Sequence, residues 1–571
     1  MRIRHRGVNN KITGIVSSFD GTPVLLPTST KDDRFFYIKG RISSAVKMGT
    51  LVEGQIIRMK LRHIKILKII EKDIGKKSLN YLTLSEKNMS MSFSTEIIEE
   101  CQKKRELSKF SSSHKDFTAL PFITVDPPNA MDKDDAVCAL EAPKEANCKF
   151  LIYIAIADVS YFVAENSQTD IEARKRGNST YLPGLCIPML PQKLSSDLCS
   201  LVENRIRPSI VVEIKLNSKG EKIDHEFHRA IIKNKKAFTY DEFVSQKNKA
   251  VSKNTHYKKS LDVLWKTYNL LINNRYDRSP LELNFPEITI EIDHLDKVKS
   301  IKNVKRTEAN LLIEELMVLA NTCAAQTLLK NSNDPLFRIH MSSIGEKLGT
   351  TGPFKYFNGF LKRNDTLTTK YLNDLLKSAT SREERFLIQK DIVNILEQAR
   401  YSTKKIGHFG LNLDFYTHFT SPIRRYADLI VHRKIIEYLD DKKANRQDHK
   451  KINLERICDH ISRKERLSAE AEKHATARYI ARHMKDKVGE FFSATIIEFK
   501  AKIIFLKIDY LNADGIIILR RLGNSMLFFN KRSSYLHDRN SNQKIVIGSK
   551  ITTTLIKANE LNGRLTFEYS S

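Results

Sequence analysis

The chain has 571 residues, with 96 Lys plus Arg against 67 Asp plus Glu and a formal net charge of +29. This length exceeds what a single hydrophobic core normally holds together, so it predicts three or four domains. The positive excess indicates a polyanionic partner, most commonly nucleic acid, although a Lys-rich composition bias would raise the charge in the same way.

Other patterns argue against several classes of protein. The seven Cys residues form no CxxC pair and no zinc-type spacing with His, which predicts free buried thiols in a reducing compartment. The longest apolar run, Leu151 to Ala164, contains Asp158 and is too short to cross a membrane. Residues Met1 to Asn10 are basic with no apolar stretch after them, so we expect no secretory signal. We therefore expect a soluble, cytoplasmic protein with no membrane partner.

Residues 1–75 alternate short apolar segments with turn signals and predict five strands. Five strands in this length favour a small barrel of the oligonucleotide-binding (OB) or cold-shock type. One segment mixes aromatic with basic residues, in the order Lys31, Arg34, Phe35, Phe36, Tyr37 and Lys39. Such a surface binds single strands by stacking on their bases, and a core role for at least one of these aromatics fits equally well.

The acidic segment Thr124 to Val137 reads TVDPPNAMDKDDAV. It places four carboxylates within ten residues, at Asp126, Asp132, Asp134 and Asp135. Apolar β-type runs flank it, so we expect a loop between two strands. Carboxylates this close raise one another's pKa unless a cation neutralises them, and hard oxygen ligands suit Mg²⁺ or Mn²⁺.

A solvated acidic turn and a calcium loop are the alternative interpretations of this segment. Counted from Asp126, the sixth and twelfth positions of a calcium loop would be Met131 and Val137, where that loop needs Gly and Glu. The solvated turn stays open on sequence grounds.

The rest of the chain is predicted as a linker and three further parts. Residues 76–117 are rich in Ser, Lys and Glu, with one short helix over Thr95 to Lys109. Residues 118–440 mix strand and helix patterns, and Ala309 to Leu329 reads as a mostly buried helix.

The C-terminal third begins with a helical connector, residues 441–487, in which a highly charged helical stretch runs from 454 to 488. Residues 488–571 return to short strand patterns and predict a second small barrel. The expected fold is multidomain α+β, with a mixed α/β domain between two barrels.

Four separated blocks of the sequence form one ordered set. The acidic quartet is the first. The others are Tyr181 to Leu201 (YLPGLCIPMLPQKLSSDLCSL), Arg306 to Asn321 (RTEANLLIEELMVLAN) and Ile406 to Arg433 (IGHFGLNLDFYTHFTSPIRRYADLIVHR). In these four blocks the chain resembles the ribonuclease II / ribonuclease R (RNB) family of 3′→5′ exoribonucleases. The resemblance implies an RNB-type catalytic domain over 118–440, a cold-shock-like barrel before it and an S1-type RNA-binding barrel after it.

The resemblance also implies roles for the acids. Asp126 and Asp135 would hold a Mg²⁺ ion, with Mn²⁺ as an alternative, and Asp132 would support it. Asp134 would be tied most closely to the chemistry, through a second ion or the attacking water. Lys133 is expected to point outward, because strand-like alternation would place it opposite Asp132 and Asp134.

The remaining site residues follow the same resemblance. Arg424 matches the arginine on the scissile phosphate, and Arg425 is either structural or shares that role. Tyr181 and Tyr240 match aromatics that hold the RNA 3′ end by stacking, with core packing as the alternative. Two further RNA-binding candidates lie on the buried helix, Glu314 and Glu315, and a plain helix salt bridge would explain them equally well.

The predicted function is processive hydrolysis of single-stranded RNA from its 3′ end, giving nucleoside 5′-monophosphates in RNA turnover or processing. The expected protein is a monomer. We expect no nucleoside triphosphate as partner, because no GxxxxGK[ST] loop is present. Two alternatives are an RNA-binding protein whose nuclease site has decayed and a metal-dependent DNA exonuclease.

Overall fold

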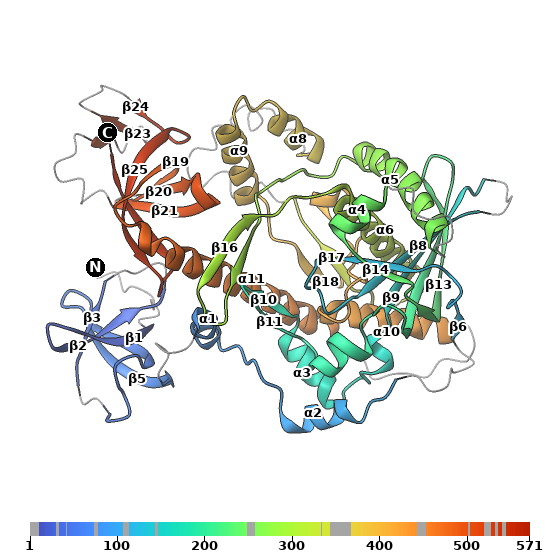
Figure 1. Ribbon diagram of the computed structural model, residues 1–571, viewed down its shortest axis with the longest axis horizontal. Coiled ribbons are helices and arrows are strands. Elements are labelled where there is room, and N and C mark those ends of the chain that lie inside the picture. Colours follow the sequence, from blue (N-terminus) through green and yellow to red (C-terminus); the bar gives the residue numbers. More distant parts are fainter. Residues whose placement is uncertain are drawn as a thin grey trace, which may run out of the picture.

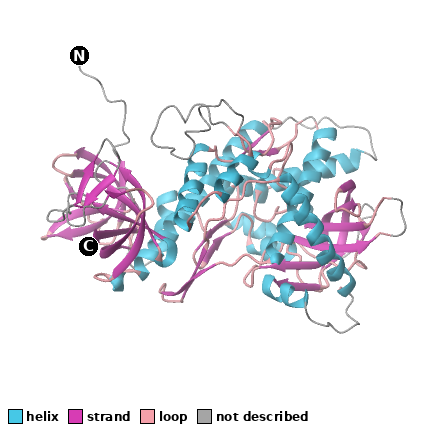
Figure 2. Cartoon of the chain, turned by 90° about the horizontal axis from the view of Figure 1, so that it is seen from above, coloured by secondary structure: helices cyan, strands magenta, loops and turns pink. Residues whose placement is uncertain are grey.

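The computed structural model has two small barrels at one end and a larger mixed domain at the other (Figure 1). A view from above shows the same division (Figure 2). The structure describes residues 11–29, 34–40, 43–72, 78–106, 114–142, 147–247, 257–332, 334–342, 367–441, 453–500, 503–518, 527–530, 535–538 and 544–570.

The N-terminal barrel closes in the order β1-β2-β3-β5-β4. Its strands are β1 (Lys11–Phe19), β2 (Thr22–Pro27), β3 (Phe36–Ile38), β4 (Leu51–Arg58) and β5 (His63–Glu71). Alternation along β3 buries Phe36 in the barrel core and leaves Tyr37 partly exposed. Phe35 stacks on Phe19 with ring centroids 4.6 Å apart. One of the three aromatics is therefore a core residue, while Lys31 lies outside the described residues.

Two helices lie in the predicted linker, α1 (Leu79–Lys87) and α2 (Thr95–Gln102). Helix α2 begins where the helical piece was predicted to begin, but it ends at Gln102 and residues 103–106 are not helical, so the helix is shorter than predicted; the predicted end at Lys109 falls outside the described residues. Helix α1 was not predicted. Its N-terminus is capped by the Ser78 hydroxyl, which accepts a hydrogen bond from the backbone N–H of Tyr81.

The central domain is built on a seven-stranded sheet in the order β14-β7-β8-β9-β12-β13-β6. Its strands are β6 (Lys115–Asp116), β7 (Ile123–Asp126), β8 (Asp135–Glu141), β9 (Phe150–Ala157), β12 (Ile206–Leu216), β13 (Lys222–Lys233) and β14 (Lys236–Thr239). The long apolar run supplies β9, which is buried along nearly its whole length. Asp158 follows it directly and forms an ion pair with Arg229 at 2.9 Å.

The main helices of this domain are α3 (Gln168–Arg176), α4 (Tyr240–Lys247), α5 (Lys258–Arg278), α6 (Glu308–Asn331) and α10 (Tyr426–Asp441). Helix α6 is the predicted buried helix. Among the described helices it alone is long and apolar enough to cross a membrane, and 67% of its most apolar window is buried inside the protein. Its apolar residues pack in the main core with those of α5 and α10.

Smaller elements complete the central domain. Three two-stranded sheets are formed by β10 (Thr180–Leu182) with β11 (Leu185–Ile187), β15 (Ile288–Ile292) with β16 (Val298–Asn303), and β17 (Phe337–Ile339) with β18 (Arg400–Ser402). Helices α8 (Thr369–Lys377) and α9 (Arg382–Ile395) have a small core of their own.

The long helix α11 (Leu454–His483) connects the central domain to the barrels (Figure 1). The C-terminal barrel closes in the order β19-β20-β21-β26-β25. Its strands are β19 (Phe491–Lys500), β20 (Ile503–Ile508), β21 (Ala513–Ile518), β25 (Lys550–Asn559) and β26 (Arg564–Tyr569). A separate sheet holds β22 (Leu527–Asn530), β23 (Tyr535–Asp538) and β24 (Lys544–Ile545). The predicted fold class is confirmed: in sequence order, a mixed domain lies between two barrels.

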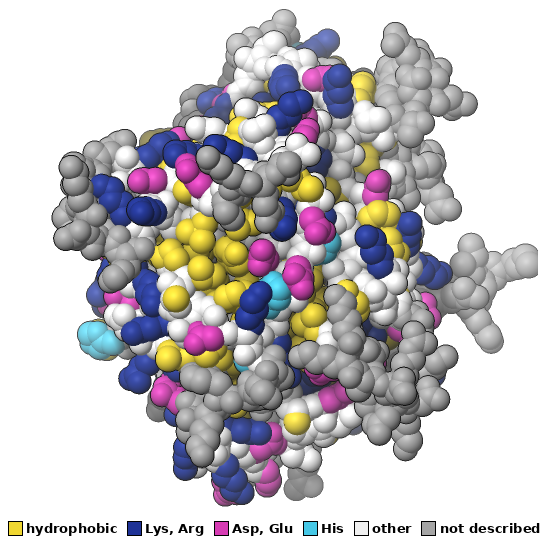
Figure 3. All heavy atoms as spheres, turned by 90° about the vertical axis from the view of Figure 1, so that its right-hand side faces the viewer, with side chains coloured by type: hydrophobic (Ala, Val, Ile, Leu, Met, Phe, Trp, Pro, Cys, Tyr) yellow, Lys and Arg dark blue, Asp and Glu magenta, His cyan; other side chains and the backbone are white. Residues whose placement is uncertain are grey.

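The end of the central domain that faces away from the barrels shows a hydrophobic area surrounded by charged side chains (Figure 3). Lys and Arg are spread over this face together with Asp and Glu and do not gather into one patch. All seven Cys are free thiols. Five of them are buried, whereas Cys148 is partly buried and Cys186 is exposed.

Candidate active site

The acidic loop connects two neighbouring strands of the central sheet. Strand β7 ends at Asp126 and β8 begins at Asp135, so the residues between them form the loop. The Ser200 hydroxyl donates to the carbonyl oxygen of Met131 at 2.8 Å and accepts from the backbone N–H of Lys133 at 3.0 Å. Ser200 therefore holds the loop through hydrogen bonds to the loop backbone, as a preorganised site requires.

A cavity of about 800 Å³ opens over this loop. It brings together all four predicted acids, the predicted arginine and both tyrosines: Asp126, Asp132, Asp134, Asp135, Tyr181, Tyr240 and Arg424. These side chains come from four separate segments of the chain. The other three predicted site residues, Glu314, Glu315 and Arg425, do not line this cavity.

Asp134 has the least exposed surface of the four acids, at 4%. Its Oδ1 accepts a hydrogen bond from the backbone N–H of Ile423 at 2.8 Å, and its Oδ2 lies 3.5 Å from Nε of Arg424. Burial raises the pKa of Asp134 well above its ordinary value, while the positive charge of Arg424 acts in the opposite direction. This carboxylate therefore links the acidic loop to the segment that carries Ile423 and Arg424, the arginine loop.

Asp126 and Asp135 interact unfavourably. Burial, and after it the negative charge of Asp126, raises the pKa of Asp135 to about 7. Burial also raises the pKa of Asp126, and the ammonium group of Lys133 opposes that shift. A cation placed between two such carboxylates would favour the ionised form of both.

Lys133 points into the acidic cluster, which corrects the expectation that it points outward. Its Nζ lies 3.3 Å from Oδ2 of Asp126. The expectation assumed strand-like alternation from Asp132 to Asp134, but β8 begins only at Asp135. The loop before it follows no alternation, so the side chain is free to turn toward the nearest carboxylate.

This arrangement predicts a pH-dependent stability in the absence of metal. Because the pKa of Asp135 is raised to about 7, the folded state holds its proton more tightly than the unfolded state does. Its contribution to the free energy of unfolding therefore decreases as pH rises toward and through 7. In EDTA, we expect the unfolding temperature of the parent to fall more steeply than that of Asp135→Asn between about pH 5 and about pH 7.5. Equal slopes would contradict this prediction.

Tyr181 and Tyr240 stand on two walls of the cavity. The Tyr181 hydroxyl donates to Oδ2 of Asp132 at 2.9 Å, and 40% of the residue is exposed. Tyr240 directly follows β14, whose Thr239 pairs with Asp126 in the sheet. Burial, followed by the two nearby aspartates, raises the pKa of Tyr240 to about 12, so its hydroxyl stays protonated at neutral pH. Neither tyrosine is a fully buried core residue.

Arg424 and Arg425 are neighbours in very different surroundings. The Arg424 side chain is 42% exposed, and its Nη2 donates to the Ser421 hydroxyl at 3.0 Å. Arg425 donates from Nε and Nη2 to both carboxylate oxygens of Asp428, at 2.9 and 2.8 Å. Asp428 also accepts from the backbone N–H of Ser421 at 2.8 Å. Arg425 thus shapes the loop that presents Arg424, and RNA contact by Arg425 stays a prediction.

The acidic pair on α6 binds arginine side chains. Glu315 is 4% exposed and pairs with Arg275 and Arg278, while Glu314 pairs with Arg275 and Arg306. This geometry favours the salt-bridge interpretation of the pair. Neither glutamate lines the acid-lined cavity, and contact of either one with RNA stays a prediction.

The structure adds groups that the sequence did not single out. Ile423 supplies a backbone N–H to Asp134, and Asp428 anchors the arginine loop. A π-helical turn over Lys193–Leu198 contributes a further wall, with Gln192, Ser195 and Ser196 in the lining. The backbone N–H of Ile423 could not be found from the sequence, because any non-proline residue supplies such a donor. The π-helical turn, in contrast, lies within the quoted block from Tyr181 to Leu201.

The donor set of the cavity suits a hard divalent cation. Carboxylate oxygens supply its charge, and no histidine lines it among the described residues. Within the described part of the chain, no group of three or more acidic, His or Cys side chains is arranged closely enough to hold an ion. Asp126 and Asp135, whose mutual repulsion a cation would relieve, stay the predicted ligands.

The family model of the RNB domain matches residues 114–441, more than half of the chain. The central sheet, most of its helices and the acid-lined cavity fall within this match. The chain therefore belongs to the RNB family, and the resemblance found in its sequence is confirmed.

Relatives named ribonuclease R align along most of the chain. That of Buchnera aphidicola subsp. Schizaphis graminum is 30% identical over 95% of this chain and 76% of its own length. That of Escherichia coli is 30% identical over 80% of this chain and 57% of its own length.

Solved structures share the fold. The apo form of Mycoplasma genitalium RNase R has a TM-score of 0.83 at 24% identity, covering 98% of this chain and 89% of that one. Yeast Ssd1, described as a pseudonuclease, has a TM-score of 0.67 at 16% identity, covering 94% of this chain and 68% of that one. The fold is thus shared with a pseudonuclease, so the fold alone does not establish activity.

Proposed function

We propose that this chain is a processive, hydrolytic 3′→5′ exoribonuclease that releases nucleoside 5′-monophosphates from single-stranded RNA. It is an RNB-family protein with ribonuclease R relatives along most of its length. The observation that carries the proposal is the cavity in which the four aspartates meet Arg424 and Tyr181. A decayed site would be expected to lose these acids first.

A series of cavities supports a path for one strand. The acid-lined cavity shares Tyr181 and Arg424 with a cavity of about 250 Å³, which shares Glu472 with a third of about 520 Å³. The third shares Lys507 with a cavity of about 840 Å³ that lies between α9 and the C-terminal barrel. A strand that follows these shared walls would pass from the barrel to the acids.

The aspartates and Arg424 have separate roles in hydrolysis. Divalent cations, Mg²⁺ or Mn²⁺, would supply an activated water and neutralise phosphate charge when held by Asp126 and Asp135 with support from Asp132. Asp134 orients the attacking water. Arg424 donates its N–H groups to the non-bridging phosphate oxygens and stabilises the charge that develops on them.

The tyrosines hold the 3′ end. Stacking on an aromatic ring tolerates any base, so Tyr181 and Tyr240 bind the terminal nucleotides without regard to sequence. The hydrogen bond from Tyr181 to Asp132 fixes the ring relative to the acids. The substrate is the 3′ end of unpaired RNA, and the enzyme acts as a cytoplasmic monomer without a nucleoside triphosphate.

One assay tests this proposal. A single-stranded RNA labelled at its 5′ end should give a ladder of shortening products with Mg²⁺ or Mn²⁺ and none with EDTA. DNA of the same sequence should resist. Equal cutting of DNA would support a DNA exonuclease. Tight RNA binding without any cutting, with either metal, would support a decayed RNA-binding protein.

RNA binding without metal should weaken steeply as salt rises. Lys and Arg side chains along the barrels and the cavities release counterions when they bind phosphates, and each contact on a single strand adds about −0.7 to the log–log slope. Filter binding or fluorescence anisotropy over a salt series measures this slope. An affinity that hardly changes between low and physiological salt would mean that the +29 charge reflects composition bias.

A further inference from the structure

One fully buried arginine touches both terminal barrels. Arg478 of α11 is 1% exposed and among the largest fully buried side chains of the described residues. Its guanidinium donates to the carbonyl oxygens of Leu561 (2.9 Å) and Thr28 (3.2 Å), to the Thr83 hydroxyl (2.5 Å) and to Glu86 (2.6 Å). Thr28 directly follows strand β2 of the N-terminal barrel, Thr83 and Glu86 lie on α1, and Leu561 lies in the turn between β25 and β26 of the C-terminal barrel.

The same junction contains a small hydrophobic cluster drawn from both barrels. Ile15 and Leu51 of the N-terminal barrel pack with Leu82 of α1, and Leu561 of the C-terminal barrel packs against them. Gly563, in the same turn as Leu561, lies so close to α11 that an added Cβ would come within 2.8 Å of a side-chain atom there. The contact between the barrels is therefore apolar as well as polar.

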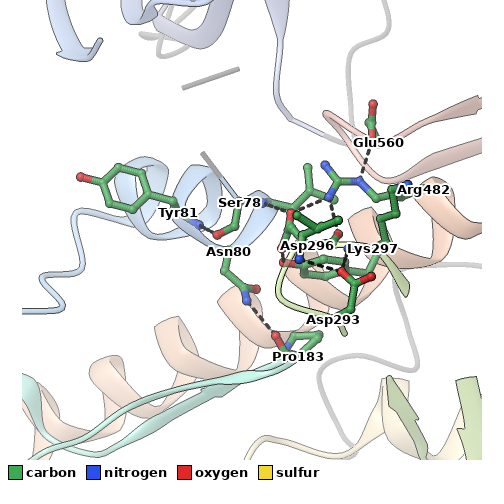
Figure 4. A network of polar contacts seen from close by, with 12 residues as sticks. Ser78, Asn80, Tyr81, Pro183, Asp293, Asp296, Lys297, Arg482 and Glu560 are labelled. Carbon is green, nitrogen blue, oxygen red and sulfur yellow. Dashed lines mark hydrogen bonds and ion pairs between the residues drawn. The ribbon is translucent and has the colours of Figure 1, made fainter. Parts of the chain in front are cut away.

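Asp296 attaches the central domain to this junction (Figure 4). It lies in the turn between β15 and β16, and its carboxylate accepts hydrogen bonds from the backbone N–H of Leu79 at 3.2 Å and the Tyr479 hydroxyl at 2.5 Å. Arg482 donates to the same carboxylate and pairs with Glu560 of the C-terminal barrel at 2.8 Å. Three parts of the molecule thus meet along the last turns of α11.

A buried guanidinium is tolerated only when its donors are paired. The partners of Arg478 come from three segments that are far apart in the sequence: Thr28, Thr83 with Glu86, and Leu561. Any rotation of one barrel against the other would leave part of this charge buried without a partner. The junction therefore favours one relative orientation of the two barrels.

We propose that Arg478 is a positioning residue that holds the two barrels together as one RNA-binding arm. This inference rests on the proposed function. The C-terminal barrel lines the outermost cavity through Lys507 and Lys550, whereas the described residues of the N-terminal barrel line none of the four cavities. The N-terminal barrel adds to the grip on RNA only while it is held beside the C-terminal one.

The expected effect depends on RNA length. Two binding surfaces at a fixed spacing raise each other's effective concentration for one strand, and this gain is lost when the spacing is loose. With Arg478→Met, we expect affinity for an RNA of about 30 nucleotides to fall on the order of tenfold, and the run length of digestion to shorten. Hydrolysis of an RNA of about five nucleotides, which reaches only the inner cavities, should stay within about twofold of the parent.

Two further variants make this test specific. Arg466→Met removes the same charge from an exposed position on the same helix. It should leave both the affinity for the long RNA and the hydrolysis of the short RNA unchanged. Thr83→Val removes one acceptor and keeps the shape of the side chain, so it should reproduce part of the loss on long RNA. If Arg478→Met fails to fold, the Thr83→Val variant still tests whether the junction supports binding of long RNA.

Binding of the long RNA is measured in EDTA, so that it does not depend on cleavage. An equal loss on short and long RNA, an unchanged affinity for long RNA, or the same loss in Arg466→Met would each overturn the inference. Failure of the parent to digest either RNA with metal would count against the proposed function, while the EDTA binding series would still decide the role of Arg478.

Discussion

Replacing Asp134 with Asn should abolish hydrolysis and leave RNA binding near normal or tighter. Asparagine keeps an oxygen that accepts the N–H of Ile423, so the loop geometry is preserved. The lost charge lies 3.5 Å from Arg424, the predicted phosphate-binding residue, so it also repels a phosphate bound there. Its removal therefore leaves the attacking water unoriented, which costs catalysis, and it favours binding of the anionic RNA. Single-turnover cleavage and binding in EDTA measure the two effects separately.

Asp241→Asn is a matched control for this variant, because it removes a carboxylate from an exposed position on α4. It should cleave at the parent rate. An Asp134→Asn enzyme that retains more than a few per cent of parent activity would contradict the assigned role. Loss of binding together with cleavage would indicate that Asp134 is needed for folding.

Substitution of Arg424 should be nearly as damaging. Arg424→Ala should lose on the order of 10²–10³ in rate, the usual effect of removing one donor to a transition state. Arg424→Lys should also be severely impaired, because a point charge cannot reproduce the two parallel hydrogen bonds of a guanidinium. Turnover near the parent rate in either variant would refute a phosphate-binding role.

Arg425 provides the contrast to Arg424. Its bidentate pair with buried Asp428 supports the loop, so Arg425→Ala leaves a buried carboxylate without its partner. We expect its main effect on the unfolding temperature, whereas Arg424, which is partly exposed in the cavity, should affect rate without a comparable change in stability.

The local patterns predicted much of the fold because they carry their own periodicity. Short apolar runs separated by turn residues identified the strands of both barrels, and the apolar spacing identified α6 and α11. Helix α1 was missed because it is short and is held by distant partners, among them Arg478 and Asp296. The sequence near residue 80 gives no sign of those partners, because they lie hundreds of residues away along the chain.

The site was predictable where residue type alone carries the chemistry. Four acids close in sequence must also be close in space, and they share the cavity with Arg424 and Tyr181. Lys133 was placed wrongly because the loop is not a strand, and its ion pair with Asp126 is a tertiary contact. For Glu314, the sequence left RNA contact and a salt bridge equally open, and only the positions of Arg275 and Arg306 favour the salt bridge.

The direction of digestion tests the central claim most directly. One single-stranded RNA would be labelled in separate samples at its 3′ and 5′ ends and incubated with the parent enzyme and Mg²⁺. We predict that the 3′ label leaves at the earliest times as a mononucleotide, while the 5′ label stays on long RNA that shortens progressively to a small end product. Early release of the 5′ label as a mononucleotide, or internal fragments from either label, would contradict a 3′→5′ exoribonuclease.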